Sequence, residues 1–78
     1  MREQIILSDV DLDILDFIRK EKYIKDICNY FNISYIKSNR HILRLNKLNC
    51  LTIQNLGNLK ILKINKKGEE ILKCLRLI

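Results

Sequence analysis

The sequence predicts a single mainly helical α+β domain over residues 1–78, and three observations support that prediction. Four segments repeat apolar residues at the spacing of an amphipathic helix. Two short alternating segments late in the chain flank an Asn-Leu-Gly-Asn connection, which is typical of a β-hairpin. Hydrophobic residues make up 47% of the chain and charged residues 31%. That composition supplies both a core and a hydrated surface, and it excludes intrinsic disorder.

The first helix is expected over residues 9–22, after an N-terminal extension of residues 1–8. Ser8 is a favourable N-cap residue, and acidic residues follow it where the helix dipole favours negative charge. Apolar residues at helical spacing then continue the pattern: Val10, Ile14, Phe17 and Ile18. We interpret the acidic residues as a capped, solvated helix start and not as a carboxylate site; they are Asp9, Asp11, Asp13 and Asp16.

Residues 25–48 predict two helices separated by a tight turn. Tyr23 and Ile24 interrupt the helical pattern and are compatible with a very short strand. From there the helical period continues as far as Asn32, a residue that tolerates the left-handed conformation of a turn. Ser34 is then suited to cap the helix that follows.

The third helix, residues 35–48, has two different faces. Projected at about 100° per residue, its inner face is small or aliphatic and comprises Ser38, Ile42, Leu45 and Leu48. The opposite face is basic and comprises Lys37, Arg40, Arg44 and Lys47. A helix with this arrangement packs on a core while it presents cations to the solvent.

A hairpin and a last helix are expected to complete the chain. Asn49 stands where a left-handed residue ends a helix. Extended segments are expected over residues 51–54 and 59–65, with residues 55–58 connecting them. Asn65 is then suited to cap a helix over residues 66–76.

The basic charge is distributed unevenly along the chain. Fifteen Lys and Arg residues against nine Asp and Glu give a formal net charge of +6. Residues 9–22 are net −2, whereas residues 23–50 and residues 51–78 are each net +4. So positive a balance in a small domain indicates an anionic partner. A membrane is disfavoured, because the basic stripe of the third helix lies opposite its apolar stripe and no apolar run approaches the length of a spanning helix.

The inventory of reactive side chains argues against an enzyme and against a cofactor or metal site. The chain has one histidine, His41, no closely spaced cysteine pair and no Gly-rich phosphate loop. His41 is interpreted as a structural residue at the edge of the core. Cys28, Cys50 and Cys74 are interpreted as free thiols, with Cys28 and Cys74 at core-like helical positions. A disulfide would be expected only if the source were a hyperthermophile.

The order of elements resembles a winged helix-turn-helix domain, with residues 25–48 as the helix-turn-helix and residues 51–65 as the wing. Residues 37–51 (KSNRHILRLNKLNCL) resemble the segment from recognition helix to wing in regulators of the MarR and ArsR type. The spacing matches at Arg40-His41-Ile42, at Leu45 and at Asn49-Cys50-Leu51. Asn49 replaces the usual Gly, and Ser38 replaces the usual core aliphatic residue. Residues 64–68 (INKKG) resemble the Leu-Thr-x-x-Gly that opens the helix after the wing. In size and in its Ile, Lys and Asn bias the chain is also similar to small regulators of archaeal viruses and plasmids.

The resemblance implies that the helix of residues 35–48 enters the major groove of duplex DNA and that residues 54–60 of the wing contact the backbone or the minor groove. Arg40 is the best candidate for reading a base, because Arg pairs bidentately with guanine. The other basic residues of the helix are expected on phosphates. The expected contact set is Ser34, Tyr35, Ile36, Lys37, Asn39, Arg40, Arg44, Lys47, Asn55, Asn58 and Lys60. A DNA contact is the alternative interpretation of His41.

The implied function is sequence-specific binding of double-stranded DNA by a cytoplasmic transcriptional regulator, in a host cell if a virus or plasmid encodes it. A protein-interaction module that meets an acidic partner is the alternative, and binding of double-stranded RNA is a third hypothesis. A homodimer is expected, because a core this small needs additional support. The apolar segments expected to form its interface are Ile5–Leu7, Leu72, Leu75, Leu77 and Ile78. Ordinary packing within the domain is the alternative interpretation of these segments. No small-molecule ligand is inferred.

Overall fold

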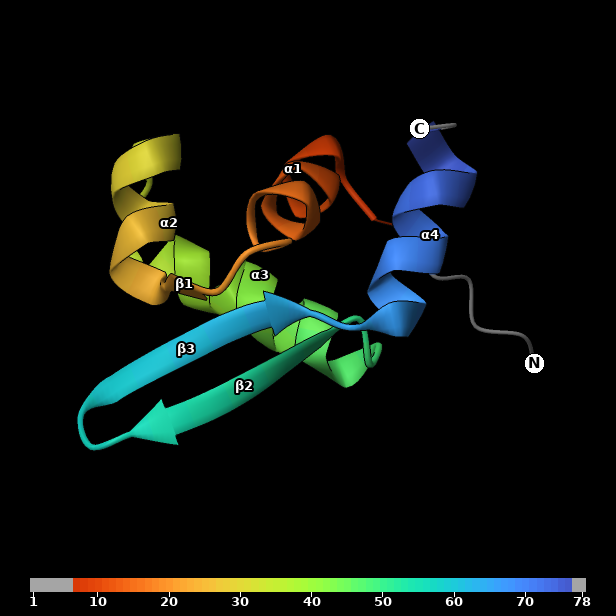
Figure 1. Cartoon of the computed structure of the whole chain (residues 1–78). Coiled ribbons are helices and arrows are strands. Elements are labelled where there is room, and N and C mark those ends of the chain that lie inside the picture. Colours follow the sequence, from red (N-terminus) through yellow and green to blue (C-terminus); the bar gives the residue numbers. More distant parts are fainter. Residues whose placement is uncertain (1–6, 77–78) are drawn as a thin grey trace.

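The seven helices and strands of the computed structural model follow the predicted order (Figure 1). Residues 7–76 are described, so the expectations for residues 1–6, 77 and 78 lie outside the described part of the chain. The elements are α1 (Asp9–Phe17), β1 (Lys22–Tyr23), α2 (Ile24–Phe31), α3 (Tyr35–Lys47), β2 (Leu51–Leu56), β3 (Leu59–Ile64) and α4 (Lys66–Arg76). The mainly helical α+β prediction is therefore confirmed.

The expected cap residues begin the helices. Ser8 caps α1 reciprocally with Asp11: the Asp11 amide donates to Ser8 Oγ over 3.2 Å, and the Ser8 amide donates to Asp11 Oδ2 over 3.0 Å. Ser34 Oγ accepts from the Lys37 amide and so caps α3. Asn65 Oδ1 accepts from the Gly68 amide over 2.8 Å and caps α4. These starts were predictable because a cap acts within a few residues of itself.

Two predicted boundaries of the first helix and first strand are wrong. α1 ends at Phe17, not at Lys22, because the Ile18 carbonyl accepts from the Ile64 amide and Lys22 pairs with Leu62 of β3. The first strand is correspondingly Lys22–Tyr23, and Ile24 already begins α2. A long-range pairing thus replaces the end of a helix that local periodicity would have continued.

The hairpin is longer and its turn is tighter than the sequence predicts. β2 and β3 pair antiparallel from Leu51 with Ile64 to Leu56 with Leu59, which leaves a turn of two residues in place of four. Gly57, the first residue of that turn, has φ +61, which glycine adopts without strain. β1 adds to the other edge of β3, giving the strand order β1-β3-β2.

Two left-handed residues end the helices that precede the turns. Asn32 has φ 54 after α2, and Asn49 has φ 59 after α3, as expected for Asn at these positions. α3 itself ends at Lys47, one residue before the predicted end. The carbonyl of Asn49 accepts from Asn65 Nδ2 over 2.7 Å, so the end of α3 is tied to the start of α4.

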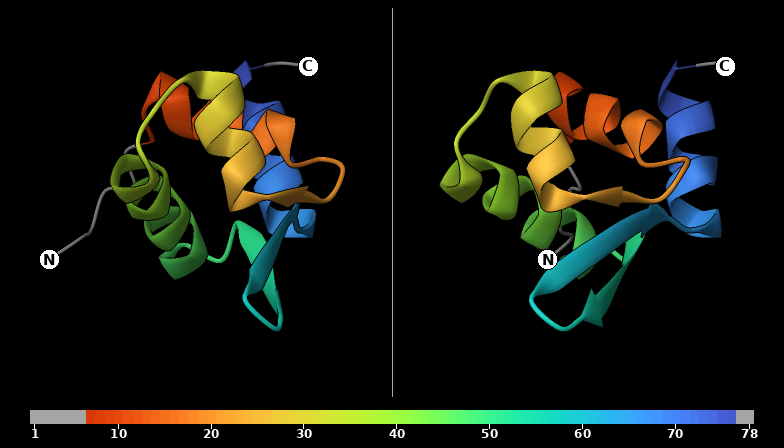
Figure 2. Two further views of the ribbon diagram at one scale, coloured as in Figure 1. Left: turned by 90° about the vertical axis from the view of Figure 1, so that its left-hand side faces the viewer. Right: turned by 60° about the vertical axis from the view of Figure 1, so that its left-hand side comes forward.

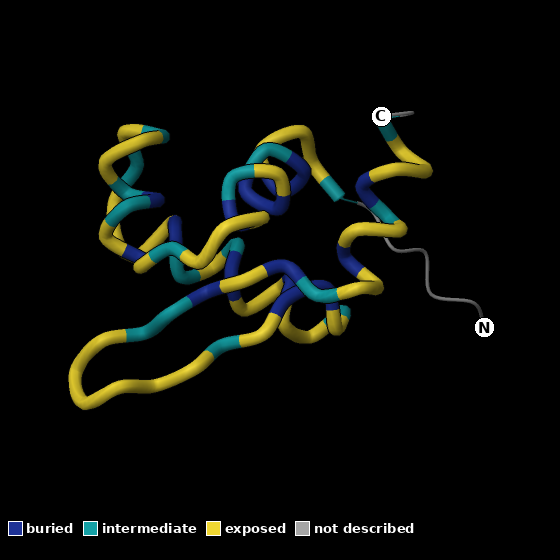
Figure 3. Tube along the Cα trace, viewed as in Figure 1, coloured by how far each residue is buried: buried dark blue, intermediate teal, exposed yellow. Residues whose placement is uncertain are grey.

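The core lies where the four helices meet the base of the hairpin (Figures 2 and 3). Its fully buried apolar members come from every helix, from β3 and from the connections after α1 and α3: Ile14, Leu15, Ile18, Ile27, Leu45, Cys50, Leu62 and Leu72. Gly68, the third residue of α4, lies against the backbone at Cys50, where a Cβ would lie 2.0 Å from the carbonyl oxygen. The second glycine of the chain is therefore required by close packing.

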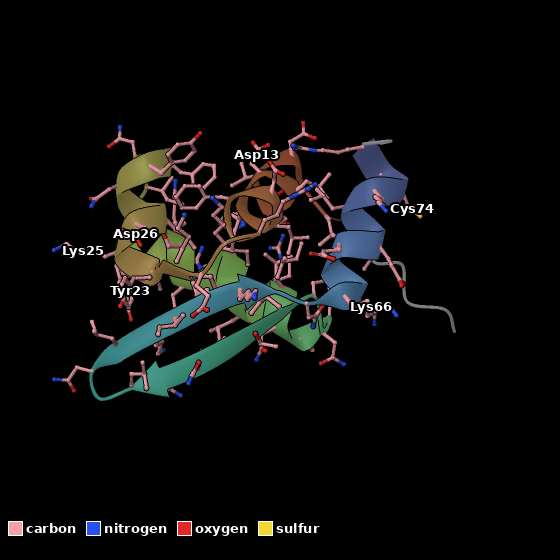
Figure 4. All side chains as sticks on the ribbon, in the orientation of Figure 1. Asp13, Tyr23, Lys25, Asp26, Lys66 and Cys74 are labelled. Carbon is pink, nitrogen blue, oxygen red and sulfur yellow. The ribbon has the colours of Figure 1, made fainter. Side chains whose placement is uncertain are left out.

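The exposure of three α4 side chains tests what the sequence predicted for them. Leu72 is fully buried and belongs to the core, which contradicts its assignment to a dimer surface. Leu75 is 58% exposed. Cys74, expected to pack, is exposed and lies on the outer side of α4 (Figure 4), because α4 turns only one face to the body of the domain. Within the described residues, no helix has the length and apolar character needed to cross a membrane.

Candidate nucleic-acid interface

The inner face of α3 is occupied by the core, as its periodicity predicts. Ser38, Ile42 and Leu45 are buried and Leu48 is half-buried. Ser38, which replaces the aliphatic residue usual in the regulators that the sequence resembles, has its Oγ 3.2 Å from the Cys28 Sγ of α2. This contact satisfies a hydroxyl that would otherwise be costly to bury, and it links the two helices of the helix-turn-helix.

The outer face of α3 is exposed and has no acidic residue. Its exposed basic side chains are Lys37, Arg40, Arg44 and Lys47. Exposed apolar and aromatic side chains lie between them, namely Tyr35, Ile36 and Leu43. Ser34 is also exposed, whereas Asn39 is only half-exposed. Seven residues of the expected set thus lie on this accessible surface or at its edge, in addition to the partly shielded Asn39.

The carboxylate of Asp11 lies beneath this outer face and was missed as a functional group. Asp11 is fully buried, which contradicts its interpretation as part of a solvated helix start. His41 Nδ1 donates to Asp11 Oδ1 over 2.6 Å, and Arg44 donates to Asp11 Oδ2 over 3.3 Å. One carboxylate of α1 therefore holds two side chains of α3, one turn apart. The position of Asp11 at the third residue of the helix indicated a cap, but no local signal showed that α3 would cross over it.

The surroundings of Asp11 stabilise its negative charge. Burial raises the pKa of this carboxyl, but hydrogen bonds from the Ser8 backbone and from His41 lower the pKa by more, so that it lies below its ordinary value of 3.8. His41 is half-buried and engaged with Asp11, which agrees with its interpretation as a structural residue. Arg44 is different: its side chain remains 52% exposed, so it can contact a further anion while it contacts Asp11.

Most of the negative charge of α1 is neutralised within the domain. Asp13 pairs with Arg76 of α4 over 2.6 Å, and Asp16 pairs with Arg19 over 2.8 Å. Together with the Asp11 cluster, these pairs leave the exposed cations of α3 without a strong opposing field from the acidic helix. Within residues 7–76, no three His, Cys, Asp or Glu side chains gather as a metal site.

The second group of expected contacts lies on the hairpin, which projects away from the helices (Figures 1 and 3). Asn55 and Asn58 are exposed, and Lys60, which pairs with Asn55, is half-buried. The structure therefore divides the expected set between α3 and the hairpin. Sequence reasoning did not single out Leu56 and Leu59 of the hairpin tip, although both are about half exposed (50% and 53%).

Comparison by sequence finds no matching protein-family model and no matching curated protein. Comparison by structure finds several solved proteins of the same architecture. A possible transcriptional regulatory protein from Mycobacterium bovis (fragment 1–100) superposes with a TM-score of 0.82 at 12% identity, over 90% of this chain and 77% of that one.

Two further structures agree. The homodimeric winged helix-turn-helix DNA-binding domain of a possible ArsR-family transcriptional regulator from Mycobacterium bovis gives a TM-score of 0.80 at 12% identity, over 90% of this chain and 67% of that one. The transcriptional regulator HlyU from Vibrio vulnificus gives a TM-score of 0.77 at 16% identity, over 87% of this chain and 73% of that one. At identities this low, the superpositions establish the fold alone. The chain has the winged helix-turn-helix fold that its sequence resembles.

Proposed function

We propose that this chain is a cytoplasmic transcriptional regulator that binds double-stranded DNA sequence-specifically, with α3 in the major groove and the hairpin on the adjacent backbone or minor groove. One observation supports the proposal most strongly. α3 has its inner face filled by the core, and its opposite face is basic, exposed and free of acidic residues. The hairpin that follows is also free of Asp and Glu. Such a surface attracts the phosphates of a duplex over its whole length.

The exposed residues of α3 divide by the role that their chemistry suits. Arg40 is exposed in the middle of the helix and is the candidate for bidentate recognition of guanine. Lys37 and Lys47 are point charges suited to phosphates. Arg44 contacts Asp11 with one nitrogen and is still half exposed, so it is suited to hold a phosphate in a fixed direction.

A salt titration of DNA binding tests the proposal. Fluorescence anisotropy with a labelled random-sequence duplex should show an affinity that falls steeply between about 50 and 200 mM salt, because condensed counterions are released. The Lys37→Ala/Lys47→Ala double variant removes two expected phosphate contacts, so it should weaken binding and lower the slope of log Kd against log salt by about two. These two residues are preferred to Arg44, whose loss would also disturb Asp11.

The matched control is Lys20→Ala/Lys73→Ala. It removes the same two charges from exposed positions, one in the loop after α1 and one on α4. Its salt slope should remain close to that of the wild type. No binding at low salt, or equal losses in both double variants, would contradict the proposed interface. Competition by A-form RNA duplex or by polyglutamate would instead favour RNA binding or an acidic protein partner.

We further propose that the chain binds DNA as a homodimer. The solved Mycobacterium bovis domain is homodimeric, and Leu75 of α4 leaves a large apolar side chain in solvent here. A two-fold dimer should select half-sites separated by about 34–36 Å, one turn of the duplex. Selection from a random duplex library, together with the mass of the complex, measures both quantities. A monomeric complex on a single half-site would contradict the dimer and leave DNA binding intact.

A further inference from the structure

The tip of the hairpin exposes two leucines that are direct partners across the strands. Leu56 ends β2 and Leu59 begins β3, and the two flank the turn Gly57-Asn58. Their exposed fractions are 50% and 53%. The tip is the part of the hairpin farthest from the core, and Figure 3 shows it exposed throughout. Single exposed leucines are common on protein surfaces, but two that pair at the end of a projecting hairpin form a small apolar patch.

Strand alternation keeps these leucines away from the core. Partners across an antiparallel ladder lie on the same face, and the faces alternate along the strand. The pairs Leu51–Ile64 and Ile53–Leu62 face the core, so the pair Leu56–Leu59 lies on the opposite face. Burying it in the domain would require a shift of register by one residue, which would expose Leu62. The two leucines therefore do not contribute to the packing of the core.

The side chains around the leucines indicate what the tip contacts. The polar side chains near the tip are amides and an ammonium group, from Gln54, Asn55, Asn58 and Lys60. Gln54 shares the face of the leucines, whereas the pair Asn55–Lys60 lies on the other face. No acidic residue occurs between Leu51 and Asn65. Proteins that bind the DNA minor groove combine Asn, Gln, Lys or Arg, which reach its base edges, with apolar wedges that enter between base pairs. A lipid surface would favour aromatic anchors, and the tip has none.

We propose that Leu56 and Leu59 form an apolar wedge that enters the minor groove, partly unstacks a base step and bends the duplex. The inference rests on the proposed function, because it requires a duplex held by α3. It goes beyond that function in assigning the wing an architectural action. Flexible pyrimidine–purine steps should be preferred at the point of entry, because they unstack at the lowest cost. Part of the sequence preference would then arise where no side chain reads a base.

The test measures bending and binding separately. A duplex of about 30 base pairs, taken from the library selection and carrying a donor and an acceptor at its ends, reports its end-to-end distance by energy transfer. The wild-type protein at saturation should shorten that distance, as a bend of at least about 20° does. The Leu56→Ala/Leu59→Ala variant should bind with a loss of no more than about tenfold, since the unstacking cost disappears together with the apolar burial. Its complex should have the end-to-end distance of free DNA.

Two further variants serve as controls. Val10→Ala removes exposed apolar surface from α1, which belongs neither to the proposed DNA contacts nor to the proposed dimer contact, and should leave the bend unchanged. Leu56→Ile/Leu59→Ile keeps the apolar volume, suits a strand and should retain the bend. Far-ultraviolet circular dichroism checks that each variant is folded. We expect all of them to fold, because the substituted side chains are exposed.

Each remaining outcome contradicts the wedge. A wild-type complex that binds without shortening the duplex overturns the wedge and leaves the proposed function standing. Bending that persists in the Leu56→Ala/Leu59→Ala variant also overturns it. A wild-type protein that binds no duplex overturns both proposals. A change in oligomeric state of the double variant, with bending unaltered, would assign the tip to contacts between copies of the chain.

Discussion

Replacing Asp11 by Asn should destabilise the domain far more than the same change elsewhere on α1. The carboxylate is fully buried and accepts hydrogen bonds from the Ser8 amide, His41 and Arg44. Asn offers one acceptor oxygen where two are used, and its NH2 group would face a donor. Loss of one hydrogen bond to a charged group costs about 1.5–3 kcal/mol. The Arg44 contact adds less than about 1 kcal/mol, because that side chain is 52% exposed and stays hydrated.

The expected total is a loss of about 2–3 kcal/mol in the free energy of unfolding. In a domain of this size each kcal/mol shifts the Tm by about 4–8 °C, so the Tm should fall by about 10–20 °C. Urea titration followed by circular dichroism measures the first quantity and a thermal scan the second. Asp16→Asn is the control, because Asp16 is half exposed and makes only a surface pair with Arg19, worth less than about 1 kcal/mol.

The same variant predicts a dependence on pH. The pKa of Asp11 lies below 3.8 in the folded domain, so its ionised form stabilises the fold. That contribution is complete above the unfolded pKa and is lost as the pH falls through the lower folded value. The stability difference between wild type and Asp11→Asn should therefore be constant near neutral pH and should shrink below about pH 3.8. A difference under about 0.5 kcal/mol at neutral pH would refute the reasoning, since it would mean that desolvation offsets the cluster.

Three further predictions concern packing and conformation. Gly68→Ala should lower the free energy of unfolding by at least about 2 kcal/mol, because the added Cβ would meet the Cys50 carbonyl oxygen. A thermal scan measures the loss, and a wild-type Tm would contradict the close approach. Iodoacetamide with mass mapping should label exposed Cys74 in the native protein and Cys50 only in urea. Cys50 is buried, and burial raises the pKa of its thiol while Lys67 lowers it less. Labelling of Cys50 at the rate of Cys74 would indicate that the core opens. Asn49→Ala should lower the free energy of unfolding, measured by urea titration, by about 1 kcal/mol, because alanine is strained in the left-handed backbone at that residue. Asn49→Gly should cause no such loss, and equal losses in the two variants would contradict the left-handed backbone.

The starts of α1, α3 and α4 were predictable, and the end of α1 was not. Ser8, Ser34 and Asn65 cap helices through hydrogen bonds to amides three residues away, so the signal is contained in a short stretch of sequence. The end of α1 depends on Ile64, which is remote in the chain and binds the Ile18 carbonyl. The local periodicity of the sequence contains no information on such a bond. The helix was therefore predicted to continue to Lys22.

The candidate interface was predictable to the same extent. The spacing of Lys37, Arg40, Arg44 and Lys47 places them opposite the core face of any helix, whatever that helix packs on. The hairpin was predicted from its Asn-Leu-Gly-Asn connection, and the resemblance to winged-helix regulators added it to the candidate interface. Neither signal showed that Arg44 would be shared with a buried carboxylate, since the partner lies on a helix that only the fold brings near.

The sequence by itself determined the order of the elements, the helix caps, the two faces of α3 and the positive charge of the chain after α1. These properties follow from caps and periodicities that act within single elements. The tertiary structure alone decided that Asp11 is buried under α3, that Leu72 is in the core while Leu75 is exposed, and that Leu56 and Leu59 stand at the hairpin tip. Each of these depends on which face of one element meets another. That information lies in the relative placement of elements and not in the pattern of any one of them.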